Sequence, residues 1–281
     1  MRAFRIAYDG TCYYGFQRQP DVPTVEDAIF DALQELGVLE ADAAKPDGYA
    51  AAGRTDAGVS ALAQTVAFEA PDWLTPRALN GSLPAEIRAW ASADAPPDFH
   101  ATHHASRREY TYHLYAPREA DAGEFDDAVD DGRFRAALEA LSGPDDFHNL
   151  TPDDHNTDRA PDLEARRDGE YLVVTVRAGG FCRELVRRLV SLAHAVGTGE
   201  EPRSKVDRAL SPEPLPGHEG IPPAPAEPLV LTGVAYPDLE FTVDEEAAAV
   251  AREIFDRRRR NSRTRTRVSR QLSEGVRDDR D

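Results

Sequence analysis

The chain changes several times between the residue period of a strand and that of a helix. Phe4, Ile6 and Tyr8 alternate as in a half-buried strand, and apolar residues then recur at helical spacing from Val25 to Leu36. The strand and helix patterns that follow do not alternate regularly, whereas a doubly wound parallel sheet requires regular alternation. The sequence therefore predicts an α+β fold with antiparallel sheets.

Start and stop signals mark this first strand–helix unit. Asp9-Gly10 ends the strand, Thr24 followed by Asp27 resembles a helix start, and Gly37 ends the helix. By the same criteria, further strands are expected at residues 49–52, 64–68, 87–93, 110–114, 171–176 and 229–236. Further helices are expected at residues 75–79 and 133–141, and in a segment containing Phe181, Leu185, Val186, Leu189 and Leu192. Prolines crowd residues 212–228, which predicts an irregular loop.

A chain of 281 residues is long enough for two hydrophobic cores. We expect an N-terminal α+β domain over residues 1–105 that carries Asp56, and a C-terminal α+β domain over residues 106–240. Residues 241–281 are expected to form a tail that is helical at first and then rich in arginine, with disorder in the arginine-rich part.

The sequence Gly53-Arg54-Thr55-Asp56-Ala57-Gly58-Val59 places a carboxylate between two glycines, with an arginine two residues before it. The glycines allow a sharp turn and a close approach of other chains, so Asp56 can face a ligand. In an extended chain Arg54 and Asp56 point to one face, where the guanidinium lowers the pKa of the carboxyl. On spacing alone, a polar turn with a surface ion pair is the simpler explanation.

The residues of this motif, in this order, resemble the catalytic signature of the tRNA pseudouridine synthase A family. Other segments resemble that family in the same order: Tyr8-Asp9-Gly10, Tyr13 to Gln19, Asn80 to Pro84, Asp98 to Ala101, Arg108 to Tyr112 and Phe181 to Arg187. The resemblance spans residues 1 to 240 and is weak in the acidic segment 116–131. Ser60 and Pro228 stand where histidine and glycine are more usual, which concerns the substrate loops rather than the aspartate.

The resemblance implies an isomerase that converts uridine to pseudouridine at positions 38–40 of the anticodon stem-loop of tRNA. The reaction needs no redox change and no energy donor, so no cofactor and no metal are expected. The resemblance also implies a homodimer, and a fold of two ferredoxin-like or RRM-like halves whose antiparallel sheets abut beside a central cleft.

The resemblance also assigns roles to individual residues. Asp56 would either attack C1′ of the ribose or take the C2′ proton. Tyr110 would offer an aromatic face and a hydroxyl to the uracil, and Arg187, on an otherwise apolar helix face, would pair with Asp56. Arg54 would contact RNA phosphate or fill the space left by the flipped base, and Leu229 would contact the substrate. Without the resemblance, the simpler interpretation is that Tyr110 is a core tyrosine and that the Arg187 side chain reaches solvent.

Two other functions fit parts of the sequence. A noncatalytic RNA-binding protein with RRM-like sheets would need no ionised aspartate at position 56. A hydrolase or phosphotransferase could use Asp56 as a nucleophile, but the phosphate-binding pattern Gly-x-x-x-x-Gly-Lys is absent from the sequence.

The charge balance is unusual for a protein that binds RNA. The chain has 33 basic and 51 acidic residues, a net charge of -18, and Lys45 and Lys205 are its only lysines. At about 1 M salt the screening length is only ~3 Å, so net charge hardly acts on an approaching RNA. An acidic protein that binds RNA is therefore consistent with a salt-loving cytoplasm, where repulsion between the protein and the RNA backbone is screened. Local arginines would recognise the RNA through stacked or bidentate contacts.

Other features point to a cytoplasmic, soluble protein. The first residues, Met1 to Phe4, lack an apolar signal core, and no apolar run approaches the length of a membrane span. Cys12 and Cys182 form no paired pattern and are expected to be free thiols. His100, His103 and His104 lack the spacing and cysteine partners of a metal site, so we expect polar loop residues there.

The tail concentrates positive charge on an otherwise acidic chain, in Arg257 to Arg260, Arg263, Arg265, Arg267 and Arg270. Like charges at this density repel, and few apolar residues after Phe255 could be buried. Two interpretations stay open: a solvated helix end that offsets the acidic body, or an arm that gathers tRNA and orders on binding. Within the second half, the acidic stretch 119–131 is expected to be a solvated loop.

Overall fold

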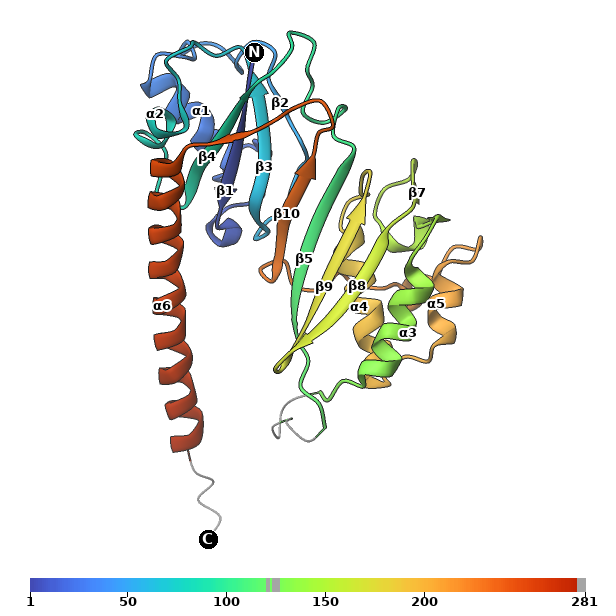
Figure 1. The fold of residues 1–281 in the computed structure, drawn as a ribbon. Helices are drawn as coiled ribbons and strands as arrows, with labels where there is room; N and C mark the ends of the chain where they lie inside the picture. The colour runs from blue at the N-terminus through green and yellow to red at the C-terminus, as the bar shows by residue number, and fades with distance from the viewer. Residues whose placement is uncertain (120–121, 123–126, 277–281) are drawn as a thin grey trace.

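The structure is a computed structural model that describes residues 1–119, 122 and 127–276. Within these residues, one 9-stranded mixed sheet has the strand order β11, β4, β1, β3, β10, β5, β9, β8, with β2 beside β3 (Figure 1). Its strands are β1 Arg2–Tyr8, β2 Ala50–Ala51, β3 Ser60–Phe68, β4 Ile87–Asp94, β5 Arg107–Tyr115, β8 Asp162–Asp168, β9 Tyr171–Ala178, β10 Leu229–Ala235 and β11 Thr242–Val243. A small second sheet pairs β6 Asp145–Asp146 with β7 Asp158–Arg159.

The helices belong to two groups and one long C-terminal element. They are α1 Val25–Glu35, α2 Pro76–Asn80, α3 Asp131–Leu141, α4 Leu185–Thr198, α5 Ser204–Ala209 and α6 Glu245–Gly275, with short 3-10 turns at Gly10–Cys12, His148–Leu150 and Gly217–Glu219. In Figure 1, α1 and α2 lie with β1 to β4, whereas α3, α4 and α5 lie with β5, β8 and β9. The mixture of elements confirms the α+β class.

The first strand–helix unit forms where the sequence predicts it. The Thr24 hydroxyl accepts a hydrogen bond from the Asp27 backbone N–H at 3.2 Å, and this bond caps the start of α1. Gly37 follows the helix with a φ of 67°, a conformation that costs glycine little. The predicted strand at residues 64–68 begins four residues earlier, at Ser60, because Ser60 and Ala61 pair with β10 and Ala61 also pairs with Tyr8 of β1.

Two hydrophobic cores lie along the sheet. Ile29 and Leu33 of α1 pack with Phe4 and Ile6 of β1, and all four side chains are fully buried. The second core joins α3 and α4 to β5, β8 and β9. Each large apolar side chain buried in this way contributes about 1.5–3 kcal/mol relative to an exposed one.

The sheets of the two halves are continuous, which differs from the expectation of two abutting antiparallel sheets. β10 comes from the end of the second half and inserts between β3 and β5. It pairs in parallel with β3, matching Val230 to Ser60, and antiparallel with β5, matching Leu231 to Tyr110. The spacing of apolar residues cannot reveal this, because the period of a strand does not identify its partner.

The helix predicted to contain Phe181 begins four residues later, at Leu185. Glu184 has a φ of 58°, a left-handed conformation outside an α-helix, so the preceding residues form a loop. Phe181 and Cys182 therefore lie outside α4. The structure also contains α5 and β11, which the sequence patterns do not predict.

The arginine-rich part of the tail belongs to α6, which runs without interruption from Glu245 to Gly275. Residues 277–281, and residues 120, 121 and 123–126 of the predicted acidic loop, lie outside the described residues. In the described part of the chain, no helix is both long enough and apolar enough to cross a membrane.

Candidate active site

The turn that carries Asp56 lies directly before β3 and is held from three sides. The hydroxyl groups of Tyr8 and Thr55 form a buried hydrogen bond, with their oxygens 2.8 Å apart. The Gln64 side-chain amide donates to the Gly53 carbonyl at 2.9 Å. The Phe16 backbone N–H donates to the Thr55 carbonyl at 3.0 Å. These bonds fix the backbone before the aspartate, and the Gly58 backbone N–H, which donates to the Tyr13 carbonyl at 3.2 Å, fixes it on the other side.

The opening loop packs tightly on this turn. A Cβ atom at Gly15, which has a φ of 98°, would lie 2.9 Å from the Thr55 carbonyl oxygen. The Gly10 backbone N–H donates to the Ser60 hydroxyl at 3.0 Å. Ser60, where histidine is more usual, therefore ties the two loops together. Gly58 has a φ of 82°, so the second glycine of the motif makes the predicted sharp bend.

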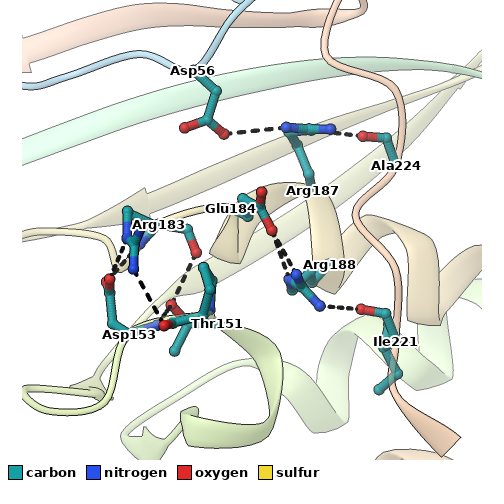
Figure 2. Close-up of polar contacts among 10 residues, drawn as sticks. Asp56, Thr151, Asp153, Arg183, Glu184, Arg187, Arg188, Ile221 and Ala224 are labelled. Atoms are coloured by element: carbon teal, nitrogen blue, oxygen red, sulfur yellow. Dashed lines mark hydrogen bonds and ion pairs between the residues drawn. The ribbon is translucent and has the colours of Figure 1, made fainter. Parts of the chain in front are cut away.

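Arg187 of α4 faces Asp56 across the junction of the two halves (Figure 2). Its Nη1 lies 3.2 Å from Oδ2 of Asp56, and its Nε donates to the Ala224 carbonyl at 2.6 Å. The two side chains are only 15% and 32% exposed. The expected partnership of Arg187 and Asp56 is thus present, and the Ala224 carbonyl fixes the guanidinium in the orientation that makes it.

The pKa of Asp56 is raised above its usual value. Burial is the largest cause, and the hydrogen bond and charge of Arg187 oppose it. The expectation that Arg54 lowers this pKa is wrong, because Arg187 supplies the neighbouring guanidinium and burial outweighs it. Arg54 is exposed, and within the described residues it makes no hydrogen bond or ion pair.

Tyr110 lies on β5, and its ring meets the ring of Phe181 edge to face, with centroids 5.2 Å apart. Burial, followed by the negative charge of Asp56, raises the pKa of Tyr110 to about 12. The hydroxyl is therefore protonated at neutral pH. Within the described residues it makes no hydrogen bond, which leaves it available to a bound molecule.

One cavity of about 770 Å³ brings together all the residues singled out in the sequence: Arg54, Asp56, Tyr110, Arg187 and Leu229. The parallel pairing of β3 and β10 explains why distant segments meet here. It places the start of β3, just after the Asp56 turn, beside the start of β10, where Leu229 lies buried.

Comparisons with known proteins agree with this arrangement. A family profile described as tRNA pseudouridine synthase matches residues 137–237. Proteins named tRNA pseudouridine synthase A are 60% identical in Haloarcula marismortui, 58% in Natronomonas pharaonis and 56% in Halobacterium salinarum. These matches cover 98%, 97% and 97% of this chain, and 100%, 99% and 98% of the relatives. The chain belongs to the tRNA pseudouridine synthase A family. Its halophilic relatives also agree with the salt-loving origin inferred from the charge balance.

In this synthase, the start of α4 holds further contacts that sequence reasoning missed (Figure 2). The Glu184 carboxylate pairs with Arg188 at 2.6 Å, and Arg188 donates to the Ile221 carbonyl. Together with the bond from Arg187 to Ala224, these contacts fasten the proline-rich segment to α4. A left-handed residue such as Glu184 carries no clear signal in a single sequence.

A second group of hydrogen bonds holds the loop before α4. The Asp153 carboxylate accepts hydrogen bonds from the Arg183 side chain at 2.5 Å and from its backbone N–H at 2.9 Å. Both residues line the cavity of the synthase. Arg108, which also lines the cavity, is buried and donates to the carbonyls of Ala52, Gly179 and Thr102, which joins the two halves. In the sequence, Arg108 was identified only as part of a family segment.

The histidines at the edge of the cavity contact one another. The His100 backbone N–H donates to Nδ1 of His104 at 2.8 Å, and the rings of His100 and His103 lie 4.2 Å apart. In the described part of the synthase, no group of three or more metal-ligating side chains is arranged to hold a metal ion. Cys12 and Cys182 are free thiols, as expected.

Proposed function

We propose that the protein isomerises uridine to pseudouridine in tRNA, with Asp56 as the catalytic carboxylate. Family membership supports the reaction and the substrate class. The observation that carries the assignment is the Asp56 carboxylate, which faces Arg187 at 3.2 Å in a cavity shared with Tyr110. A noncatalytic RNA-binding protein would not need a partly buried carboxylate in such a cavity, so that alternative is not favoured.

The reaction breaks the bond from uracil N1 to C1′ and forms a bond from C5 to C1′. C5 loses a proton and N1 gains one, so atoms balance without a cofactor. The target base has to leave its stack to reach the cavity, whose volume is in the usual range for a bound ligand.

Asp56 has to be ionised for either of its two possible roles. A carboxylate can attack C1′, or it can take the C2′ proton. Arg187 favours the ionised form against the cost of burial and holds the carboxylate in one orientation. Arg187 therefore stabilises the charge of the Asp56 carboxylate and orients it.

Arg54 and Leu229 complete the proposed substrate site. Leu229 offers a buried apolar surface to the base. Arg54 is exposed at the edge of the cavity without a partner among the described residues, and its guanidinium would contact phosphate or replace the flipped base in its stack.

Tyr110 is proposed to contact the uracil with its ring and to transfer a proton with its hydroxyl. Because its pKa is about 12, the hydroxyl can accept the C5 proton only while it passes its own proton on. Tyr110→Phe should therefore bind tRNA normally and lose about a hundredfold in single-turnover rate. Tyr110→Ala should also bind more weakly, because the ring is lost. Equal rates for wild type and Tyr110→Phe would confine Tyr110 to stacking.

We propose, on the basis of the family resemblance, that the target uridines are at positions 38–40 of the anticodon stem-loop. The experiment is to incubate an unmodified tRNA transcript with the protein and map pseudouridine by carbodiimide adducts that stop reverse transcription. Stops at one or more of these positions support the proposal. Stops elsewhere would reassign the target, and no stops at any uridine would reject the proposed function.

We also propose the architecture that the resemblance implies: two ferredoxin-like halves over residues 1–105 and 106–240, followed by a C-terminal segment. The two hydrophobic cores and the junction at β10 support this division. We further propose that the protein acts in the cytoplasm, where tRNA is available.

A homodimer is proposed from the resemblance, because two copies could share one long RNA. Light scattering in concentrated potassium chloride should then give twice the mass of the 30.9 kDa chain. A mass of one chain at the concentration used for activity would reject the dimer.

A further inference from the structure

We propose that residues 257–275 of α6 form an arm that binds tRNA phosphates outside the stem-loop held in the cavity. This inference rests on the proposed function, because it takes tRNA as the partner. It adds a second contact surface to a synthase whose cavity lies at the junction of its two halves.

The first observation is that this part of α6 is positively charged, whereas the chain as a whole is negatively charged. The chain has a net charge of -18, yet eight arginines and no acidic residue occur from Arg257 to Ser273. Phosphate groups are the partner that such a run of guanidinium groups binds best, through charge-assisted and often bidentate hydrogen bonds.

The second observation is that only part of this charge is used within the protein. Arg257, Arg259, Arg260 and Arg270 pair with acidic residues three or four positions away on α6. Three more arginines are exposed, and their side chains make no hydrogen bond or ion pair within residues 1–119, 122 and 127–276: Arg263, Arg265 and Arg267.

The third observation is the orientation of the helix. Ala247 and Ala251 are buried against the body, and Arg258, seven residues after Ala251, lies on the same helix face. The opposite face carries a stripe of arginines at spacings of three and four residues: Arg260, Arg263, Arg267 and Arg270. This stripe therefore points away from the body, toward solvent. Arg265, seven residues after Arg258, lies on the anchored face of the helix instead, but it is also exposed.

Arg258 anchors the arm beside the catalytic turn. Its guanidinium pairs with Asp9 and with Glu86. Asp9 is followed by Gly10, whose backbone N–H binds Ser60 next to the Asp56 turn. The arm thus begins near the cavity, although its side chains are not part of it.

Beyond this anchor, α6 runs past the ends of β1 and β4 (Figure 1). From Arg258 to Gly275 an α-helix rises about 25 Å. Like charges three or four residues apart destabilise a helix, and a bound polyanion removes that repulsion. An RNA longer than the stem-loop in the cavity fits this length and this charge. The other occupant to consider is the acidic surface of a second copy of the chain.

The experiment uses the triple variant Arg263→Gln, Arg265→Gln and Arg267→Gln in the full chain. Its affinity for full-length tRNA should fall about tenfold at the lowest salt that keeps the protein folded, and the slope of log affinity against log salt should decrease by about 3. The single-turnover rate at saturating tRNA should be unchanged. Affinity for an anticodon stem-loop hairpin should also be unchanged, because the hairpin does not reach the arm.

Two matched variants separate charge from folding. Replacing the same three arginines with lysine keeps the charge and should restore most of the affinity. The control replaces three exposed arginines elsewhere, Arg133, Arg135 and Arg166, with glutamine and should leave affinity and salt slope unchanged.

Unchanged affinity of the glutamine triple variant for full-length tRNA across the salt series would overturn the inference. Loss of the dimer in this variant with unchanged RNA affinity would also overturn it, because the arm would then bind a second copy of the chain. Equal losses for the arm and control variants would also overturn it, because they would reflect net charge alone. Absence of pseudouridine with the wild-type protein would instead reject the proposed function, and the binding comparison would still decide the role of the arm.

Discussion

Asp56→Asn is expected to abolish pseudouridine formation while tRNA still binds. The amide keeps the shape of the side chain and can still contact Arg187, but it cannot act as a base or nucleophile at neutral pH. The single-turnover rate of tritium release from tRNA labelled at C5 of uridine should fall by about a thousandfold or more. Filter binding of the same tRNA should give an affinity close to that of wild type.

The matched control is Asp153→Asn, because Asp153 lines the same cavity and pairs with a different arginine, Arg183. Its rate should stay within about tenfold of wild type, since it would disturb only the position of the loop before α4. A rate near wild type for Asp56→Asn would remove Asp56 from the proposed mechanism.

Arg187→Leu is expected to lower the rate at neutral pH by about a hundredfold and to change its pH dependence. Burial already raises the pKa of Asp56, so its carboxyl takes up a proton at a higher pH than an exposed aspartate does. The rate should therefore fall as the pH drops through this raised pKa. Without the opposing charge of Arg187, the acidic limb should move upward by a further 1–3 units, approximately.

The test is the pH profile of the single-turnover rate for wild type, Arg187→Lys and Arg187→Leu. The midpoint of the acidic limb should rise in that order, because lysine keeps the charge without the second hydrogen bond to Ala224. Arg203→Leu, which removes an exposed arginine directly before α5, should leave the midpoint unchanged. An acidic limb at the same pH in all four proteins would contradict the electrostatic role of Arg187.

Local periodicity was sufficient to predict much of the fold. Phe4, Ile6 and Tyr8 lie in β1, and Thr24 caps α1, because these features depend on neighbouring residues alone. The insertion of β10 between β3 and β5 depends on pairing between distant segments, and periodicity contains no information about that pairing.

The candidate site was only partly predictable for the same reason. The need of Arg187 for a partner follows from its place on an apolar helix face, but its pairing with Asp56 was expected from family resemblance. Spacing along the chain favours Arg54 instead, because spacing cannot account for a guanidinium that folding brings from a segment more than a hundred residues away. The contacts of Glu184 and of the Ala224 carbonyl depend on loop conformations that no pattern of residue types specifies.

The most direct test of the central claim is a comparison of two products in the same sample of tRNA labelled with tritium at C5 of uridine. Tritium released to water is counted, and pseudouridine is quantified at each mapped position. The wild-type protein should give equal amounts of released tritium and pseudouridine, and Asp56→Asn should give neither product above background. No tritium release by the wild-type protein, or equal release by Asp56→Asn, would contradict the central claim.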